Sequence, residues 1–390
     1  MLNITSKGDL PCIIFIPGKS HTQMAAYNRL VIKVLVLLIP IFGAGFDVSA
    51  QGDQHTNLGL KDYYRSFFPI GVAVTPRQLE DSAQRQLILK HFNSVTPENA
   101  MKMGPIHPEE NRYEWKDADA IVDFATKNGL KIRGHTLCWY NQTPKWIFYD
   151  KRGKLVSKTI LLGRLKDHIY EVVKRYKGKI YAWDVINEAV SDDPKEFLRN
   201  SLWYQICGEE FIAKAFEFAH EADPKAMLFY NDYNTELPGK REKIIRLIKS
   251  LLAAKVPIHA IGLQGHWSIS GPTASVLKES ILQYAMLGIK VQVTEMDISV
   301  YPDNSPGKPL EQGQQTGLSQ ALENEQMIKY DEFFSVFRQS KAQITGVTFW
   351  NLSDRYSWLD NFPVRGRKNY PLLFDENLQP KKAYWKVVTF

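Results

Sequence analysis

Cysteine is scarce in this sequence, with three residues in 390. Beyond residue 50 only Cys138 and Cys207 remain, far apart and without the close spacing that metal ligands show. A cysteine-based metal site is therefore not expected. Cys138 stands in an apolar run, where a buried free thiol is the usual state, and a disulfide with Cys207 is the less favoured alternative.

The sequence also lacks a block or stripe of basic residues. It carries 49 lysines and arginines against 42 aspartates and glutamates, a formal net charge of +7. No motif that reads bases accompanies these cations, so we expect no nucleic-acid partner. The mild basic excess allows a weak attraction to an acidic polymer, but an ordinary soluble surface is the simpler explanation.

Long hydrophobic runs are absent apart from one near the N-terminus. Residues 34–42 are apolar and follow two cations, and the small residue Ala50 ends a segment suited to signal-peptide cleavage. The run is short and broken by Pro40, so a membrane span is the less favoured alternative, and we expect no stable membrane insertion. Residues 1–50 are thus predicted to be an N-terminal extension plus a secretory signal, with Met24 as an alternative start. The protein would then be secreted or periplasmic.

Residues 51–390 contain no linker-like tract after residue 60 and no second composition, so we predict a single domain. Eight apolar, β-branched or aromatic runs alternate with amphipathic segments. Eightfold alternation of strand and helix is typical of an α/β fold of the (β/α)8 type, the TIM barrel. The predicted strands are 67–74, 92–99, 130–139, 179–188, 226–234, 258–266, 289–297 and 344–351.

The segments between these strands carry helical periodicity. In 159–176, for example, apolar residues recur with a period near 3.6. A doubly wound open sheet would alternate in the same way, but it normally has a Gly-rich phosphate loop after the first strand, and GVAVTP (71–76) lacks that spacing. The barrel is therefore favoured. Its predicted helices are 77–90, 117–128, 159–176, 208–222, 239–254, 273–286, 323–339 and 381–388.

Polar residues gather at the carboxyl ends of the predicted strands. In a barrel these ends open on one face, where barrel enzymes place their active sites. One terminal Asn or His would usually cap a turn, but seven of the eight strands end in this way. The residues are Glu98, Asn99, His135, Trp139, Asn187, Glu188, Asn231, Asp232, Asn234, Gln264, His266, Glu295, Asp297, Trp350 and Asn351.

Two of these strands end on a glutamate after an apolar run. AWDVINEAV (182–190) carries Glu188, and VQVTEMDISV (291–300) carries Glu295. A carboxylate is a costly end for an apolar strand unless it has a task. On strands four and seven the two side chains could meet across the mouth of the barrel. Two carboxyl groups that flank one bond, one protonated and one ionised, are the machinery of glycoside hydrolysis.

Six motifs carry a family resemblance: PENAMK (97–102), GHTLCW (134–139), WDVINEAV (183–190), GLQGHW (262–267), VTEMDIS (293–299) and DRYSWL (354–359). The motifs themselves, and their order along the chain, resemble those of the family 10 glycoside hydrolases, the β-1,4-xylanases. The resemblance covers about residues 60–388 and implies that residues 51–390 form the catalytic barrel. It implies hydrolysis of internal bonds in xylan by a retaining mechanism, with xylan and xylo-oligosaccharides as binding partners.

The resemblance also implies a role for each residue of the catalytic pair and its neighbours. Glu188 corresponds to the general acid/base and Glu295 to the nucleophile. Asn187 corresponds to the amide that binds the 2-hydroxyl of the sugar at the cleavage point. His266 would orient the nucleophile and Asp297 would hold His266, while Gln264 should lie near Glu188.

Further residues match the wall that grips the non-reducing side of the sugar chain: Glu98, Asn99, Lys102, His135, Trp350 and Trp358. Trp139 is a further substrate-binding candidate, because indole faces stack on sugar rings. Taken alone, Glu98 and Lys102 would be read as an i,i+4 surface ion pair worth about 0.3–0.5 kcal/mol. For Trp350 the less favoured alternative is a residue of the barrel wall. Tyr233 is an aromatic candidate on the opposite side.

Three functions remain open on the sequence: an endo-β-1,4-xylanase, a β-1,4-glycanase of the same fold with another chain preference, and a sugar-binding barrel without activity. The presence of both glutamates favours an enzyme. No metal or cofactor is expected, because the acidic groups alternate with amides and indoles and form no oxygen cage. We expect a monomer. The long segment 301–322 has no assignable residue and leaves the chain-length preference open.

Overall fold

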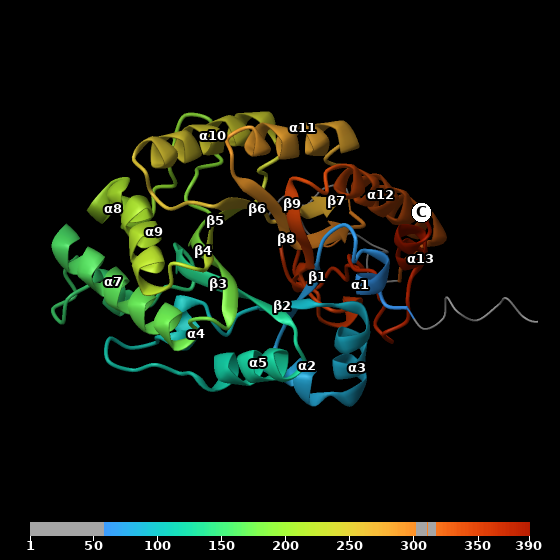
Figure 1. The fold of residues 1–390 in the computed structure, drawn as a ribbon, viewed down its shortest axis with the longest axis horizontal. Coiled ribbons are helices and arrows are strands. Elements are labelled where there is room, and N and C mark those ends of the chain that lie inside the picture. The colour runs from blue at the N-terminus through green and yellow to red at the C-terminus, as the bar shows by residue number, and fades with distance from the viewer. Residues whose placement is uncertain (1–57, 302–309, 311–316) are drawn as a thin grey trace, which may run out of the picture. The chain divides into compact units, whose positions relative to one another are not determined.

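The computed structural model describes residues 58–301, 310 and 317–390 (Figure 1). The predicted signal in residues 1–50 lies outside the described residues, as does most of segment 301–322. Within the described residues no helix combines the length and the hydropathy that crossing a bilayer requires.

Eight parallel strands close into a barrel, as predicted. Each pairs with the strand before and after it in the chain, β9 returns to β1, and β6 pairs with β8. Every predicted strand has a counterpart within a few residues. The strands are β1 (Ile70–Val74), β2 (Ser94–Pro97), β3 (Lys131–Trp139), β4 (Ile180–Asn187), β5 (Met227–Asp232), β6 (Ala260–Leu263), β8 (Lys290–Ser299) and β9 (Ile344–Phe349).

A short additional strand, β7 (His266–Ser268), is the main departure from the prediction. The sequence places residues 258–266 in one strand. In the structure Gly265 has a φ of +82°, so the chain changes direction there and the strand does not continue. The chain then pairs again with β8, in a register that sets His266 beside Asp297. The turn at Gly265 therefore brings the imidazole to the carboxylate.

Helices surround the barrel and mostly match the predicted segments. The predicted helix 77–90 is divided at Asp81, whose carboxylate accepts hydrogen bonds from the backbone N–H groups of Ala83 and Gln84 and caps the second part. The helix predicted at 208–222 begins instead at Glu210, because Gly208, with a φ of +62°, ends the preceding short helix. The helices are α1 (Leu60–Tyr63), α2 (Pro76–Glu80), α3 (Ser82–His91), α4 (Met103–Ile106), α5 (Lys116–Lys127), α6 (Lys145–Phe148), α7 (Lys158–Arg175), α8 (Leu202–Cys207), α9 (Glu210–Ala222), α10 (Pro238–Ala253), α11 (Ala274–Ala285), α12 (Gln320–Gln339) and α13 (Lys382–Val388).

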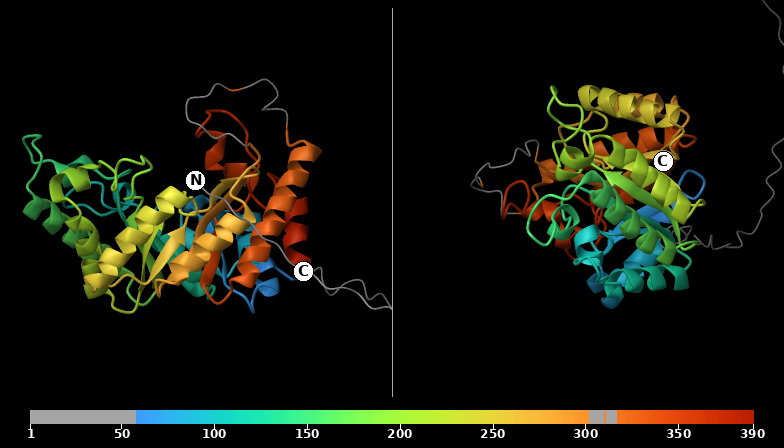
Figure 2. Two further views of the ribbon diagram at one scale, coloured as in Figure 1. Left: turned by 90° about the horizontal axis from the view of Figure 1, so that it is seen from above. Right: turned by 90° about the vertical axis from the view of Figure 1, so that its left-hand side faces the viewer.

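The helix α7 illustrates how the sequence specifies these elements. Ser157 caps its first turn through a hydrogen bond from the N–H of Ile160, and the buried side chains follow at spacings of three and four. They join the main apolar core. The two views of Figure 2 show helices along the outside of the strands, while the loops after β3 and β9 extend from one side.

Cys138 and Cys207 are both buried, and both are free thiols. The predicted free state of Cys138 is confirmed. The alternative of a disulfide with Cys207 is excluded by the structure.

Close packing of β3 against β4 generates a stability prediction. A Cβ at Gly134 would lie 2.1–2.6 Å from ring carbons of the buried Trp183. Gly134→Ala should therefore reduce the free energy of unfolding by about 1–3 kcal/mol, as expected for overpacking, in urea denaturation followed by fluorescence. The matched control is Gly163→Ala on α7, where an added Cβ meets nothing within 4 Å. It should stabilise the fold by about 0.5–1 kcal/mol. Equal effects of both substitutions would contradict the packing assignment.

Candidate active site

The two predicted catalytic glutamates lie at the carboxyl ends of their strands and are nearly buried. Glu188 follows β4 directly and is 7% exposed, and Glu295 lies within β8 and is 4% exposed. Buried carboxylates need hydrogen-bond partners. In the structure these partners are Asn187 at the end of β4, Asn231 on β5, Gln264 in the turn after β6 and His266 on β7.

One oxygen of Glu188 collects two amide donors. Its Oε1 accepts a hydrogen bond from Gln264 Nε2 at 2.9 Å and another from Asn187 Nδ2 at 3.1 Å. The predicted proximity of Gln264 to Glu188 is therefore confirmed. The two amides therefore orient the carboxyl group of Glu188, one from the end of β4 and the other from the turn after β6.

Asn231 joins the two glutamates and was not predicted as a site residue. Its Nδ2 donates to Glu295 Oε1 at 2.7 Å and to Asn187 Oδ1 at 2.8 Å, while its own Oδ1 accepts from Thr294 Oγ1 at 2.6 Å. Gly262 makes this possible, because a Cβ there would lie 2.1 Å from Asn231 Oδ1. The sequence signals were the strand-end position of Asn231 and the glycine that opens GLQGHW.

Glu295 is held in its ionised form by positive neighbours. Burial raises the pKa of this carboxyl group, but the charge of His135, the hydrogen bond from His266 and the charge of Lys102 outweigh burial and lower the pKa to about 2. His266 Nε2 lies 3.3 Å from Glu295 Oε2, and His135 Nδ1 lies 3.8 Å from Oε1. A carboxylate with these neighbours is available as a nucleophile.

The imidazole of His266 is itself positioned by Asp297, as predicted. His266 Nδ1 lies 3.0 Å from Asp297 Oδ2, which also accepts a hydrogen bond of 2.8 Å from the indole of Trp358. Burial lowers the pKa of His266, yet the charge of Asp297 and hydrogen bonds to Asp297 and Glu295 raise it to about 10. His266 is therefore a cation that donates to both carboxylates.

His135 belongs to a second set of buried, linked polar side chains. Of this set, only His135 was predicted from the sequence. His135 Nδ1 lies 2.8 Å from Asp184 Oδ2, and the other oxygen of Asp184 forms an ion pair with Arg133. Arg133 and Asp184 are both fully buried. Both stand inside predicted strands, 130–139 and 179–188, and neither was assigned a role from the sequence.

Among the described residues, one group of side chains has the geometry to hold a metal ion. His135, Asp184 and Glu295 each offer a ligand atom within 4.8 Å of the others. In the structure these atoms already pair with Arg133, His266 and Asn231. A cation there would have to displace protein charges of its own sign, so the donor set does not fit a resident metal.

The PENAMK segment forms a polar corner and no surface ion pair. Lys102 is 7% exposed, and its Nζ donates to Asn99 Oδ1 at 2.9 Å, while Asn99 Nδ2 donates to Glu98 at 3.3 Å. Burial raises the pKa of Glu98 and lowers that of Lys102. The reading of Glu98 and Lys102 as an exposed i,i+4 pair is wrong, because the ammonium turns inward toward the glutamates.

The three predicted tryptophans lie around this corner. The Lys102 ammonium lies 5.0 Å from the ring centroid of Trp139 and 5.9 Å from that of Trp350. Trp350 is 7% exposed and stands edge-on to His135 at 5.1 Å, so it also serves as barrel wall. Trp358 is half-buried and stacks on the exposed Phe362. Lys102 and the indoles together form one wall beside the glutamates.

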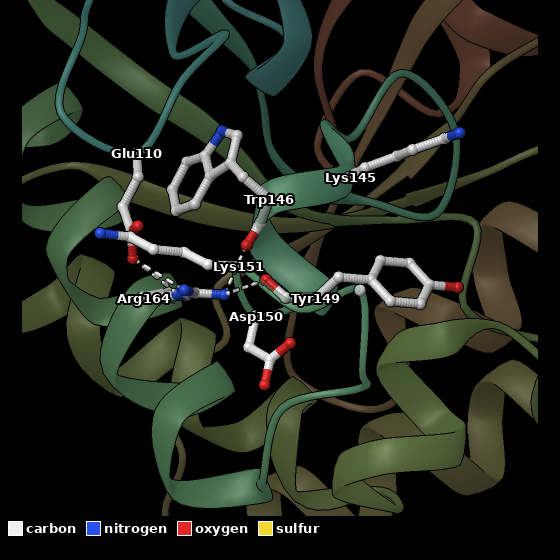
Figure 3. A pocket seen from close by; sticks show the side chains of 8 residues that line it. Glu110, Lys145, Trp146, Tyr149, Asp150, Lys151 and Arg164 are labelled. Carbon is white, nitrogen blue, oxygen red and sulfur yellow. Dashed lines mark hydrogen bonds and ion pairs between the residues drawn. The ribbon is translucent and has the colours of Figure 1, made fainter.

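A surface cavity of about 560 Å³ lies apart from this site, between α6 and α7 and the chain around Glu110 (Figure 3). None of its lining residues is a predicted site residue. Arg164 crosses the cavity and binds Glu110 at 2.7 Å and the carbonyls of Ile147 and Tyr149 at 3.2 and 3.1 Å. The guanidinium is thus committed to holding α6, and the cavity carries no catalytic arrangement.

Comparison with known proteins agrees with this geometry. The model of the family described as glycosyl hydrolase family 10 matches residues 59–390. A β-1,4-xylanase from Dictyoglomus thermophilum is 50% identical over 364 residues, which cover 93% of this chain and 99% of that protein. An endo-1,4-β-xylanase from Geobacillus stearothermophilus is 47% identical, covering 84% of this chain and 97% of that protein.

A solved structure supports the same relationship. The crystal structure of a xylanase from Paenibacillus barcinonensis superposes with a TM-score of 0.80 at 46% identity, covering 85% of this chain and 98% of that one. The family match, over residues 59–390, includes the barrel and both strands that carry the glutamates. From the barrel, its site and these relatives it follows that this chain belongs to glycoside hydrolase family 10.

Proposed function

We propose that the protein is an endo-1,4-β-xylanase that cleaves internal bonds of xylan with retention of anomeric configuration. The observation that carries this proposal is the contrast between two buried carboxyl groups joined through Asn187 and Asn231. Glu295 is surrounded by cations that keep it ionised, whereas Glu188 receives only neutral amide donors. The xylanase names of its relatives support xylan as the substrate.

The proposed reaction has two steps. Glu188 donates its proton to the glycosidic oxygen while Glu295 attacks the anomeric carbon, so the bond to the leaving chain breaks and an ester to Glu295 forms. Water then attacks the same carbon, Glu188 accepts its proton, and the ester bond breaks. Two inversions at one carbon return the β-configuration. The hydrogen bonds from Asn231 and His266 hold Glu295 in place for the first attack.

The surrounding residues hold the sugar chain in this proposal. Asn187, which donates to Glu188, is close enough to the pair to bind the 2-hydroxyl at the cleavage point. Glu98, Asn99, Lys102 and His135 would bind hydroxyls on the non-reducing side. The indoles of Trp139, Trp350 and Trp358 would pack against sugar rings.

The mechanism can be tested on the products from xylohexaose, followed by proton NMR from the first minutes with purified residues 51–390. New reducing ends should appear as the β-anomer, with xylobiose and xylotriose formed early, because a double displacement retains configuration. Early α-anomer would exclude the retaining mechanism. Release of single xylose units would indicate an exo-acting enzyme, and faster cleavage of cellohexaose would favour the broader β-glycanase.

Glu295→Ala is the matched variant for this experiment. It removes the attacking carboxylate, so xylohexaose should stay intact although its NMR signals still broaden or shift on binding. Turnover like that of the unsubstituted enzyme would refute the assignment of Glu295 as nucleophile. Binding without cleavage by the unsubstituted enzyme would favour the inactive sugar-binding barrel.

The paired His266 and Asp297 generate a pH prediction. The pKa of His266 rises from 6.5 to about 10 on folding, so its stabilising contribution is complete below pH 6.5 and is lost as the pH rises toward 10. Across that window, stability should fall by about 1.4 kcal/mol per pH unit from this group. Asp297→Asn removes the main charge that raises the pKa and should flatten this slope in urea titrations. An unchanged slope would contradict the pairing.

We also propose that the protein is exported and cleaved after Ala50. The support is the apolar run 34–42, its two preceding cations and the small residues before Gln51. The intact mass of the protein recovered from the medium or periplasm should correspond to a chain that begins at Gln51. A cytoplasmic protein that begins at Met1 or Met24 would refute this.

A further inference from the structure

The backbone of Glu188 adopts a conformation that its residue type disfavours. Its φ is +58°, in the left-handed region where glycine is usual. Such strain persists only where surrounding contacts over-determine it, and it often occurs at functional sites. The contacts that hold Glu188 in this conformation therefore also determine where its carboxyl group points.

Two contacts hold the peptide groups on either side of Glu188. Its N–H donates to the carbonyl of Asn231 at 2.9 Å, which ties it to β5. Its carbonyl accepts a hydrogen bond of 3.1 Å from Arg199 Nε, a residue later in the same loop. Arg199 also contacts the residue after Glu188: its backbone N–H donates to the carbonyl of Ala189 at 2.8 Å.

Arg199 is in turn fixed from the other side. Its Nη2 donates to Tyr233 Oη at 2.8 Å and to Asp192 Oδ2 at 3.1 Å, and its guanidinium lies 4.5 Å from the ring centroid of Tyr140. Lys240 also binds Asp192, at 2.9 Å. The side chain is 23% exposed. A side chain held by three neighbours is a rigid support for the strained carbonyl.

We propose that Arg199 is a positioning residue for the acid/base, which holds the backbone of Glu188 so that its carboxyl group can transfer a proton to the leaving oxygen. The proposal rests on the proposed function of Glu188. Without the bond from Nε, Glu188 can relax from its left-handed conformation and break its contacts with Gln264 and Asn187. Glu295 does not contact Arg199 directly, so its attack on the sugar should be spared.

Two other roles are open to an arginine in this place, and both predict different kinetics. If Arg199 served only stability, its loss would lower the rates of all substrates equally or lower none. If it only bound the leaving side of the sugar chain, its loss would raise KM for long chains and leave small aryl glycosides unaffected. A defect in proton transfer instead depends on how much the leaving group needs a proton.

The test compares two xylobiosides that differ only in their leaving group. 2,4-Dinitrophenolate departs without a proton, whereas phenolate is far more basic and needs one. For Arg199→Ala, kcat/KM should fall by about 10²-fold on phenyl β-xylobioside, the effect expected for a misplaced catalytic group. On 2,4-dinitrophenyl β-xylobioside it should fall by less than about threefold, since glycosylation there depends on Glu295 and little on proton transfer.

Three further variants complete the design. Glu188→Ala must show the same selectivity for leaving groups, and if it does not, the acid/base assignment fails rather than the role of Arg199. Arg175→Ala is the matched arginine control, because Arg175 forms an ion pair with Asp119 on the outer helices. It should change neither rate.

Arg199→Lys keeps the charge but cannot hold Glu188, Tyr233 and Asp192 together. Its kcat/KM should also fall more on phenyl than on 2,4-dinitrophenyl β-xylobioside, but by a smaller factor. If circular dichroism shows that Arg199→Ala does not fold, Arg199→Lys serves as the test variant. Equal losses on both substrates, or no loss on either, would overturn the proposal.

Discussion

The site depends on the burial of one negative charge. Glu295 is 4% exposed, and an isolated carboxylate at that depth would be protonated or would unfold the barrel mouth. Its ionised form survives because His135, His266 and Lys102 approach it from β3, β7 and the chain after β2. Each of these three side chains is held by another polar group: Asp184 contacts His135, Asp297 contacts His266, and Asn99 accepts a hydrogen bond from Lys102. The polar interior of the barrel mouth follows from this single requirement.

The fold and the catalytic pair could be predicted because their signals are local. Strand runs, helix periodicity and the polar strand ends are readable in short windows, and Glu188, Glu295 and His266 stand in specific motifs. Asn231, Arg133 and Asp184 escaped because their roles exist only between strands. The register of β3 against β4, and of β4 against β5, decides which atoms meet, and both pairings contain register shifts that no local pattern indicates.

Rules based on residue spacing alone have the same limit. Glu98 and Lys102 have the spacing of a helical ion pair, but the chain there is a bend before the short helix α4, so the spacing rule does not apply. The sequence also placed residues 258–266 in one strand, although Gly265 lies between β6 and β7. Its positive φ turns the chain and creates the separate pairing of His266 with Asp297.

Gly262 carries a consequence for how this sequence can vary. Any side chain there would occupy the space of Asn231 Oδ1, and Asn231 in turn is bound to Thr294. A Cβ at Gly262 would also lie 2.8 Å from Thr294 Cγ2, so these three positions on three strands share one small volume. A side chain can enter at Gly262 only if Asn231 and Thr294 give up space, and a library that aims to reshape the cleavage point should therefore vary the three codons together.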